Sequence, residues 1–337
     1  MFIVRSLALA TIPLTFAAAA ASPEVAPPPV LKQHIANEEF SPPDFAWMRG
    51  AFANATVIER TEYEAIQSWL EECARSAAEE TRKKLIEMGV KETPSNAPVS
   101  YPVCEQVAAK PEPEAYDDFE DFSSHYITTR PIFDALVAAT ELAENNIHRR
   151  SGSLAEDLHQ RVIADQVYRN ALSWAWSETP RDGVPHLAPK QKPIFLALLR
   201  RELAVRDRAN TEWLKEIVAD QGWPTISKVG VDASAKAWLL AQHADRDPVF
   251  QLQALRLMEP LVERGEVSAK NYAYLYDRVM LKLVGEQRYA TQVYCKGGER
   301  VPQPLEDEEK MPEQREAVGL VSFEVYLSYF SSPCPAE

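Results

Sequence analysis

Most of this chain consists of segments whose apolar residues recur at the spacing of an α-helix. The clearest of them runs from residue 62 to residue 88, and Gly89 follows it as a natural stop. Its apolar positions fall on one helical face: Ile66, Trp69, Leu70, Cys73 and Ala77. Similar segments continue toward the C-terminus, so the chain is predicted to be mainly α and multi-helical.

The other predicted helices are separated by loops rich in proline or glycine. In the first part they cover residues 131–147 with Pro131 in the first turn, 154–176, and 192–220 with a break or cap at Asp207 and Asn210. Gly230 precedes another helix, which is capped by Asp232 or Ser234 and runs to about His243. The last predicted helices cover residues 249–264, 268–285 and a short stretch near 321–329. Residues 91–114 are rich in proline and are expected to form a loop. Lys296-Gly297-Gly298-Glu299 predicts one β-hairpin near the C-terminus.

Residues 1–21 have the order of zones found in an export signal. Arg5 precedes a short apolar run from Leu7 to Phe16, and small residues from Ala17 to Ala21 offer cleavage sites. A buried N-terminal helix is the alternative interpretation. The apolar run is shorter than the roughly 20 residues that a spanning helix needs, and no later segment approaches that length. We therefore expect an exported protein, periplasmic or secreted, without membrane insertion.

Three regions are predicted after the signal. Residues 22–43 form a proline-rich linker that tethers or wraps, because the many prolines disfavour a helix. Residues 44–150 form a smaller helical region, and residues 151–337 form a helical domain that carries the hairpin.

The four cysteines allow three pairings. Their order favours Cys73–Cys104 in the first half and Cys295–Cys334 in the second, because each bridge then closes a loop within one region. No two cysteines have the two-to-four-residue spacing typical of a zinc site, and no metal is predicted. The smaller N-terminal region is therefore expected to be disulfide-linked.

The balance of charge narrows the classes of partner. The chain has 36 basic and 50 acidic residues, a net charge of −14, and repels polyanions such as nucleic acid and acidic membrane surfaces. It has no phosphate loop, dinucleotide fingerprint, nucleophile elbow or His-Glu-x-x-His motif, so no cofactor is predicted. The expected partner is a small polar molecule or an envelope protein.

Gln242, His243 and Asp245 form the first part of the candidate site. His243 falls at the C-terminal end of a predicted helix, where the helix dipole favours a cation. Asp245 follows two residues later and is predicted to orient or charge-stabilise the ring, so that His243 acts as a general acid or base. Gln242 is assigned to substrate binding. The alternative is a structural histidine that tethers a loop.

Asp277 and Arg278 lie inside an almost wholly apolar helical segment, where charged groups need compensating partners. The functional interpretation makes Asp277 an acid, base or orienting group and makes Arg278 a clamp for an anion. The alternative is a core ion pair that fixes helix packing. Arg169 shares a helical face with Asp165 and Gln166, and is predicted either to join the site as a second anion ligand or to pair locally with Asp165.

Uncharged polar residues occur at the start of the predicted hairpin: Gln287, Tyr289, Thr291 and Gln292. Hydrogen-bonding groups of this kind beside a histidine suit a small polar ligand, and Tyr289 and Gln292 are assigned to substrate binding. Pairing across the hairpin surface is the alternative.

From about residue 154 to residue 326 the chain resembles a bacterial family of unknown function. The resemblance rests on ordered motifs: Asp165-Gln166-x-x-Arg169, Gly222-Trp223-Pro224-Thr225 with Gly230, Gln242-His243-Ala244-Asp245, Asp277-Arg278, Gln287-x-Tyr289-Ala290-Thr291-Gln292, and Arg315 before Gly319-Leu320. The family usually has glycine where Ala290 stands here. The resemblance implies a shared, mostly helical domain and brings no assigned activity.

These groups together predict a hydrolase or transferase that acts on a small polar or anionic substrate. No nucleophilic serine or cysteine stands out, so water is the expected attacking group. The alternative is a non-catalytic binding or envelope-scaffold protein of the periplasm, in which the same residues form a buried structural network.

Overall fold

The computed structural model describes residues 26–91, 99–148, 152–177, 182–330 and 334. In these ranges the protein is mainly helical with two short antiparallel hairpins, one of them near the C-terminus, which confirms the predicted fold class. No helix here combines the length and apolarity needed to cross a membrane. The predicted export signal, residues 1–21, lies outside the described residues.

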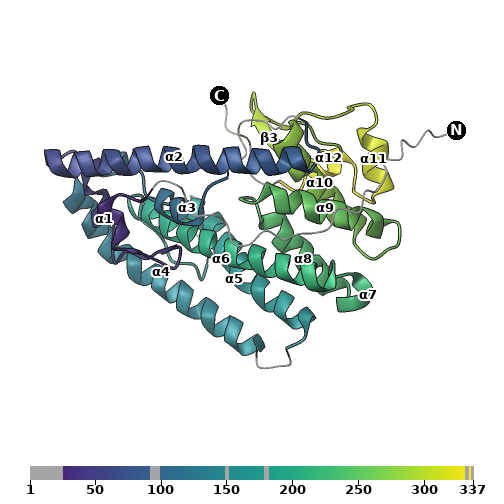
Figure 1. Ribbon diagram of the computed structural model, residues 1–337, viewed down its shortest axis with the longest axis horizontal. Helices are drawn as coiled ribbons and strands as arrows, with labels where there is room; N and C mark the ends of the chain where they lie inside the picture. The colour runs from purple at the N-terminus through teal and green to yellow at the C-terminus, as the bar shows by residue number, and fades with distance from the viewer. Residues whose placement is uncertain (1–25, 92–98, 149–151, 178–181, 331–333, 335–337) are drawn as a thin grey trace.

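The chain forms its elements in an order that Figure 1 follows by colour. The first half contains α1 (Pro29–Lys32), β1 (Ile35–Ala36), β2 (Glu39–Phe40), the 3-10 turn η1 (Ala46–Ala51), α2 (Val57–Glu87), α3 (Pro102–Ala108), the 3-10 turn η2 (Pro113–Ala115) and α4 (Phe119–His148). The second half contains α5 (Leu154–Trp176), α6 (Gln191–Gln221), α7 (Ile226–Val229), α8 (Val231–His243), α9 (Pro248–Val262), α10 (Ala269–Val284), β3 (Val293–Lys296), β4 (Glu299–Pro302), α11 (Met311–Ala317) and α12 (Phe323–Leu327).

Several helix ends are set by local capping, as the sequence predicts. The Asp247 carboxylate accepts the backbone N–H of Phe250 at 2.8 Å and starts α9. Ser268 caps α10 in the same way, and Gly285 ends that helix in the left-handed conformation. These ends fix the positions at which α8, α9 and α10 present their polar side chains.

The prediction for α4 was wrong in its start. Pro131 lies inside a helix that begins at Phe119, not in the first turn of a shorter helix. An internal proline costs roughly 3 kcal/mol. Phe122 on one side of Pro131 and Phe133 on the other are both buried in the same core, and this packing offsets that cost.

The predicted break in α6 and the predicted loop at residues 91–114 were also wrong. α6 runs unbroken through Asp207 and Asn210, because their side chains bind α5 instead of capping their own helix: Asp207 accepts from Arg169 at 2.8 Å and Asn210 from Arg161 at 3.2 Å. Residues 91–114 are not simply a loop, since they contain α3 and the start of η2. Prolines stand in the first turn of both, where they are tolerated.

Residues 26–43 wrap against the first half of the protein. Leu31 and Phe40 are buried, and the Phe40 backbone N–H donates to Gln106 Oε1 at 2.8 Å. The segment also contains the one-turn helix α1 and the hairpin β1–β2, which its proline content did not lead us to expect. The proposed division of the chain at residue 150 stays a prediction.

Buried apolar side chains form two hydrophobic cores. The first combines the N-terminal elements with parts of α5 and α6, and the second combines α8, α9 and α10 with the other parts of these helices. Three long helices contribute to both cores: α2 through Trp69 and Leu85, α5 through Tyr168 and Val162, and α6 through Phe195 and Leu214. In Figure 1, α2 accordingly extends over most of the length of the molecule.

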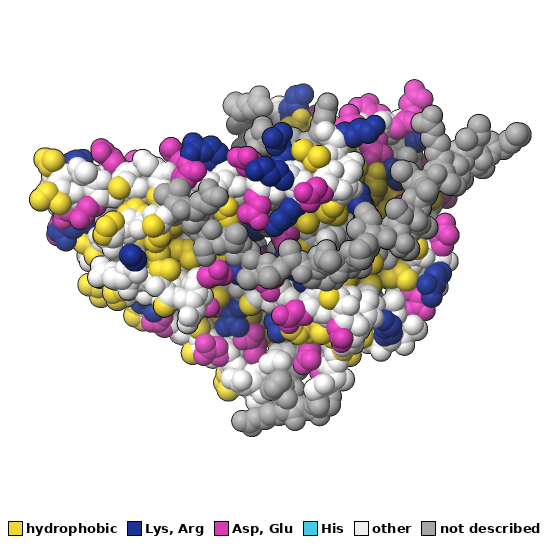
Figure 2. Space-filling view, in the orientation of Figure 1, with side chains coloured by type: hydrophobic (Ala, Val, Ile, Leu, Met, Phe, Trp, Pro, Cys, Tyr) yellow, Lys and Arg dark blue, Asp and Glu magenta, His cyan; other side chains and the backbone are white. Residues whose placement is uncertain are grey.

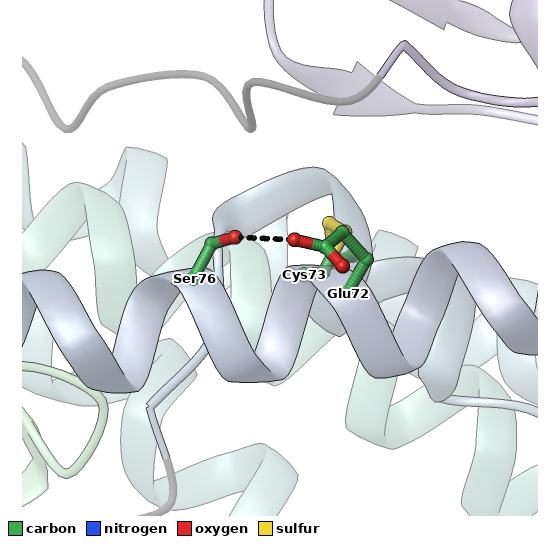
Figure 3. The surroundings of a disulfide bond; sticks show 4 residues. Glu72, Cys73 and Ser76 are labelled. Carbon is green, nitrogen blue, oxygen red and sulfur yellow. Dashed lines mark hydrogen bonds between the residues drawn. A yellow bond between two sulfur atoms is a disulfide. The ribbon is translucent and has the colours of Figure 1, made fainter.

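Both predicted disulfides are confirmed. Cys73–Cys104 joins α2 to α3, and Cys295–Cys334 joins β3 to the C-terminal segment. Figure 3 shows the first bridge on the inner side of α2, where Ser76 donates to Glu72 at 3.0 Å beside it.

Acidic and basic side chains are interspersed across the face in Figure 2, with no single-sign field on that side.

Candidate functional site

The imidazole of His243 faces the middle of α5. Its Nδ1 lies 2.8 Å and 3.0 Å from the two carboxylate oxygens of Asp165, a residue 78 positions earlier in the chain. The carboxylate that orients the histidine is therefore Asp165 and not Asp245, which sequence proximity had suggested. Since a carboxylate accepts this bond, Nδ1 carries the proton and Nε2 is the ring atom available for chemistry.

Asp165 is fully buried, and three side chains hold its carboxylate. Arg169 Nη1 donates to it at 2.6 Å and Gln166 Nε2 at 2.7 Å, in addition to His243. Burial alone would raise the pKa of Asp165, but the bond from His243 and the positive charge of Arg169 lower it below its ordinary value. The carboxylate is thus kept ionised beside the ring.

Arg169 joins this pair to a second carboxylate. Its Nη2 donates to Asp207 Oδ2 at 2.8 Å, so one guanidinium bridges α5 and α6. Burial raises the pKa of Asp207 to about 6 despite Arg169, and no described residue bonds its buried Oδ1. The local Asp165–Arg169 pair and the wider polar cluster, which the sequence left as alternatives, are both present.

A second polar group surrounds Asp245. Arg278 Nη1 donates to its carboxylate at 2.7 Å and Lys282 Nζ at 2.5 Å, while Gln251 Oε1 accepts from Lys282 at 2.9 Å. Burial opposes the charged form, yet the two cations lower the pKa of Asp245 to about 2. Two cations and one carboxylate leave this group with a surplus of positive charge beside the end of α8.

Two buried polar atoms of this region have no hydrogen-bond partner among the described residues. They are the side-chain oxygen Oε1 of Gln242 and the Nε of Arg278. A buried polar atom without a partner is costly, so both atoms are places where a ligand or water is expected to bind. Both residues were assigned to substrate binding from the sequence, and that role stays a prediction.

Asp277 holds the loop before the hairpin, and none of its hydrogen bonds to the described residues involves His243. Its carboxylate accepts the backbone N–H groups of Arg288, Tyr289 and Thr291 at 2.8–2.9 Å. The side chain is fully buried, and this burial raises the pKa of Asp277 even with three donors. Asp277 and Arg278 therefore face different groups, and these contacts favour a structural role for Asp277 over the predicted catalytic one.

The polar residues at the hairpin mainly bind the backbone. Gln287 Nε2 donates to the carbonyls of Gln292 and Gln303 at 2.8 Å and 3.0 Å. Tyr289 is buried against the ring of Tyr276, and the Gln292 side chain donates to Thr291 Oγ1 at 3.2 Å. None of these contacts links Tyr289 or Gln292 to His243, so their assignment to substrate binding gains no support from the geometry.

Ala290 occupies a backbone conformation that alanine disfavours. Its φ is 51°, and the residue is fully buried where Arg315 Nη1 donates to the carbonyls of Tyr289 and Ala290. The left-handed conformation costs an L-residue roughly 1–2 kcal/mol. Glycine would occupy this conformation without that cost.

We expect Ala290→Gly to change the free energy of unfolding by less than about 1 kcal/mol, because relief of backbone strain offsets the lost methyl group. Ala290→Val should lower it by at least about 2 kcal/mol, since a β-branched residue is poorly tolerated at positive φ. Urea unfolding of both variants tests this. Equal stability of the valine variant and the unaltered chain would contradict the backbone conformation.

Sequence reasoning missed several contributors to the site. The sequence assigned Asp207 to a helix break, and it did not single out Lys282 or Gln251. A carboxylate or a cation at an apolar position of a helix is the signal that was available. In the described part of the chain, no group of three or more His, Cys, Asp or Glu side chains is placed to hold a metal ion.

Residues 191–332 match a family model described as a family of unknown function (DUF6624). The match runs from the start of α6 past α12 and includes His243, Asp245 and Arg278, but not Asp165 or Arg169 on α5. The match agrees with the expected resemblance to a family of unknown function, and the individual motifs stay a prediction. No curated protein and no solved structure matches the chain.

Proposed function

We propose that the protein is a hydrolase or transferase in which His243 moves a proton to or from a small anionic substrate. The observation that carries the proposal is the bond between His243 Nδ1 and the buried carboxylate of Asp165, at 2.8 Å. A histidine held in this way has a fixed tautomer, and its developing positive charge is stabilised by the carboxylate. Asp165 acts as a positioning residue.

The position of His243 supports access for a substrate. Its side chain is 14% exposed, and no hydrogen bond to Nε2 is found in the described part of the chain. Nε2 can therefore take a proton from an attacking water and return it to the leaving group, which closes the proton balance of a hydrolysis. The four cysteines are in disulfides, so none of them serves as a nucleophile.

The proposal also requires positive charge to bind an anionic substrate, and the cations near Asp245 supply it. Arg278 and Lys282 share one carboxylate, which leaves net positive charge for an anionic group of the substrate. The Nε of Arg278 has no partner among the described residues and is the donor we assign to that group. Arg169 is already bound by two carboxylates, and its role in the proposal is to hold Asp165 and Asp207 in place.

The test is turnover of a defined mixture of small anionic esters, amides and phosphoesters, followed by NMR. His243→Gln should slow consumption of any substrate by about 10²–10⁴-fold, the usual contribution of a general acid or base. The same variant should lower the free energy of unfolding by no more than about 1 kcal/mol, since one hydrogen bond is altered. His159→Gln, on α5, is the matched control and should leave both quantities unchanged.

A non-catalytic binding or envelope-scaffold role is the second candidate. The observation that favours it is the internal pairing of the charged groups, above all Arg169 between two carboxylates and Asp277 under three backbone N–H groups. Under this role the mixture is not consumed and His243→Gln mainly lowers stability. That pair of results would overturn the enzymatic proposal.

We further propose that the protein is exported to the periplasm or the medium. Two disulfides among the described residues support this, because such bonds persist in oxidising compartments. The order of zones in residues 1–21 supports it independently of the bridges.

A further inference from the structure

A cavity of about 600 Å³ opens where the C-terminal end of α5 meets the N-terminal half of α6. Its volume lies in the range of small-molecule sites. The walls that matter for recognition are two tryptophans, two leucines and two cations: Trp174, Trp176, Leu187, Leu196, Lys192 and Arg200. The cavity lies apart from His243, since nine residues separate Asp165 from Trp174, roughly 14 Å along the axis of α5.

The charge at this cavity is opposite to that of the whole chain. Lys110, Lys192 and Arg200 line it together with one acidic residue, Glu112. The chain as a whole has a net charge of −14, so a local surplus of cations is not a consequence of composition. A concave site with this surplus attracts a small anion.

The three cations differ in the hydrogen bonds that they already make within the protein. Lys192 Nζ donates to the Ser177 carbonyl at 3.1 Å, and Lys110 Nζ donates to Tyr63 Oη at 2.7 Å. The guanidinium of Arg200 instead lies 5.8 Å from the centre of the Trp176 ring. Stacking on a ring leaves the edge donors of a guanidinium available, so Arg200 is the residue best placed to bind an anionic group.

The tryptophans provide an apolar surface for the uncharged part of the ligand. Trp176 is 63% exposed, an unusual exposure for so large an apolar side chain at the edge of a cavity. Trp174 is held in place against the ring of Phe195, with 5.0 Å between the ring centres. Trp174 is therefore part of the fixed wall of the cavity, and Trp176 offers an exposed ring on which a flat ring can stack.

We propose that this cavity binds an aromatic carboxylate, with its ring on Trp176 and its carboxylate on Arg200. The site is separate from the His243–Asp165 pair and does not depend on the proposed enzymatic activity. Lys110 and Lys192 contribute long-range attraction, and Arg200 contributes the direct bond. Loss of the ring or of the charge removes one of the two elements of recognition.

The probe is 2-naphthoate, titrated into the purified chain and followed by calorimetry and tryptophan fluorescence. We expect a dissociation constant on the order of 0.1–1 mM, in keeping with the size of the ligand. 2-Naphthamide, which has the ring without the charge, should bind about tenfold more weakly, and acetate should not bind measurably.

Two substitutions locate the site. Arg200→Gln should weaken 2-naphthoate about tenfold and leave 2-naphthamide unchanged, whereas Trp176→Ala should weaken both by about fivefold. Both residues are exposed, so the variants are expected to fold. Lys83→Gln on α2 and Tyr329→Ala are controls for the loss of an exposed charge and of an exposed ring, and should bind as the unaltered chain does.

Equal affinity for 2-naphthoate and 2-naphthamide would overturn the carboxylate assignment. Undiminished binding by both Arg200→Gln and Trp176→Ala would place the ligand elsewhere, and absence of binding at 10 mM, well above the weakest affinity expected for a real site, would remove the proposal altogether. None of these results bears on turnover by His243.

Discussion

Replacing Asp277 with alanine should lower the free energy of unfolding by about 4 kcal/mol, since each buried donor that loses its acceptor costs roughly 1–3 kcal/mol. The carboxylate is fully buried and accepts the backbone N–H groups of Arg288, Tyr289 and Thr291. The alanine variant removes the side-chain acceptor of all three donors. The loop before the hairpin should therefore lose its structure first.

The measurement is urea unfolding, with hydrogen exchange at residues 287–292 to show where protection is lost. Asp277→Asn should have an intermediate effect, because one amide oxygen serves fewer donors than two carboxylate oxygens. Asp220→Ala, at an exposed position near the end of α6, should change stability by less than about 0.5 kcal/mol. A loss below about 1 kcal/mol for Asp277→Ala would show that the carboxylate does not hold the loop.

Asp277 shows how far the sequence can identify a functional group. A carboxylate at an apolar position of a helix signals that a partner must exist, and here the partners are backbone groups 11 to 14 residues ahead. The sequence pattern is the same whether such a carboxylate meets a substrate or a loop. The choice between the two depends on the path of the chain after Gly285, which periodicity does not describe.

Features that depend on neighbouring residues were predictable. The bounds of α5 match the apolar period over residues 154–176, and Asp247 and Ser268 cap the helices that follow them. Features that depend on packing between helices could not be predicted from the sequence. Asp245 was chosen as the partner of His243 because it is near in sequence, whereas the packing of α5 against α8 brings in Asp165 instead.

The charged side chains around Arg169 lie where the two hydrophobic cores meet. On α5, Asp165 lies between Val162 of the second core and Tyr168 of the first, and on α6, Asp207 lies between Leu203 of the first and Leu214 of the second. Asp165, Arg169, Asp207 and His243 pair with one another here across α5, α6 and α8. Their pairing specifies how the helices align, and it also brings His243 to a partly exposed position.

The two carboxylates that share Arg169 should affect stability with opposite dependence on pH. The pKa of Asp165 is lowered in the folded state, so its contribution is present above about pH 4, the unfolded value, and is lost as the pH falls. The pKa of Asp207 is raised to about 6, so the folded state binds the proton more tightly. Its ionisation therefore lowers stability as the pH rises from about 4 to about 6.

Asp165→Asn should lower the free energy of unfolding by about 3 kcal/mol near neutral pH, because Arg169 and His243 each lose an ionised acceptor in a buried setting. This loss should shrink below about pH 4, where the carboxyl of the unaltered chain takes up a proton. The loss caused by Asp207→Asn should instead shrink as the pH rises toward 6. Urea midpoints at several pH values between 3 and 7 give both differences against the unaltered chain.

Each asparagine variant serves as the control for the other, since both remove one carboxylate from the same guanidinium. Parallel pH dependence of the two differences would mean that Asp165 and Asp207 share one environment. Opposite dependence means that the protein keeps one carboxylate ionised and the other ready to take up a proton near pH 6. Carboxylates separated in this way are the arrangement by which one site can hold both an acid and a base. It would connect the stability of the helix junction directly to the chemistry proposed for His243.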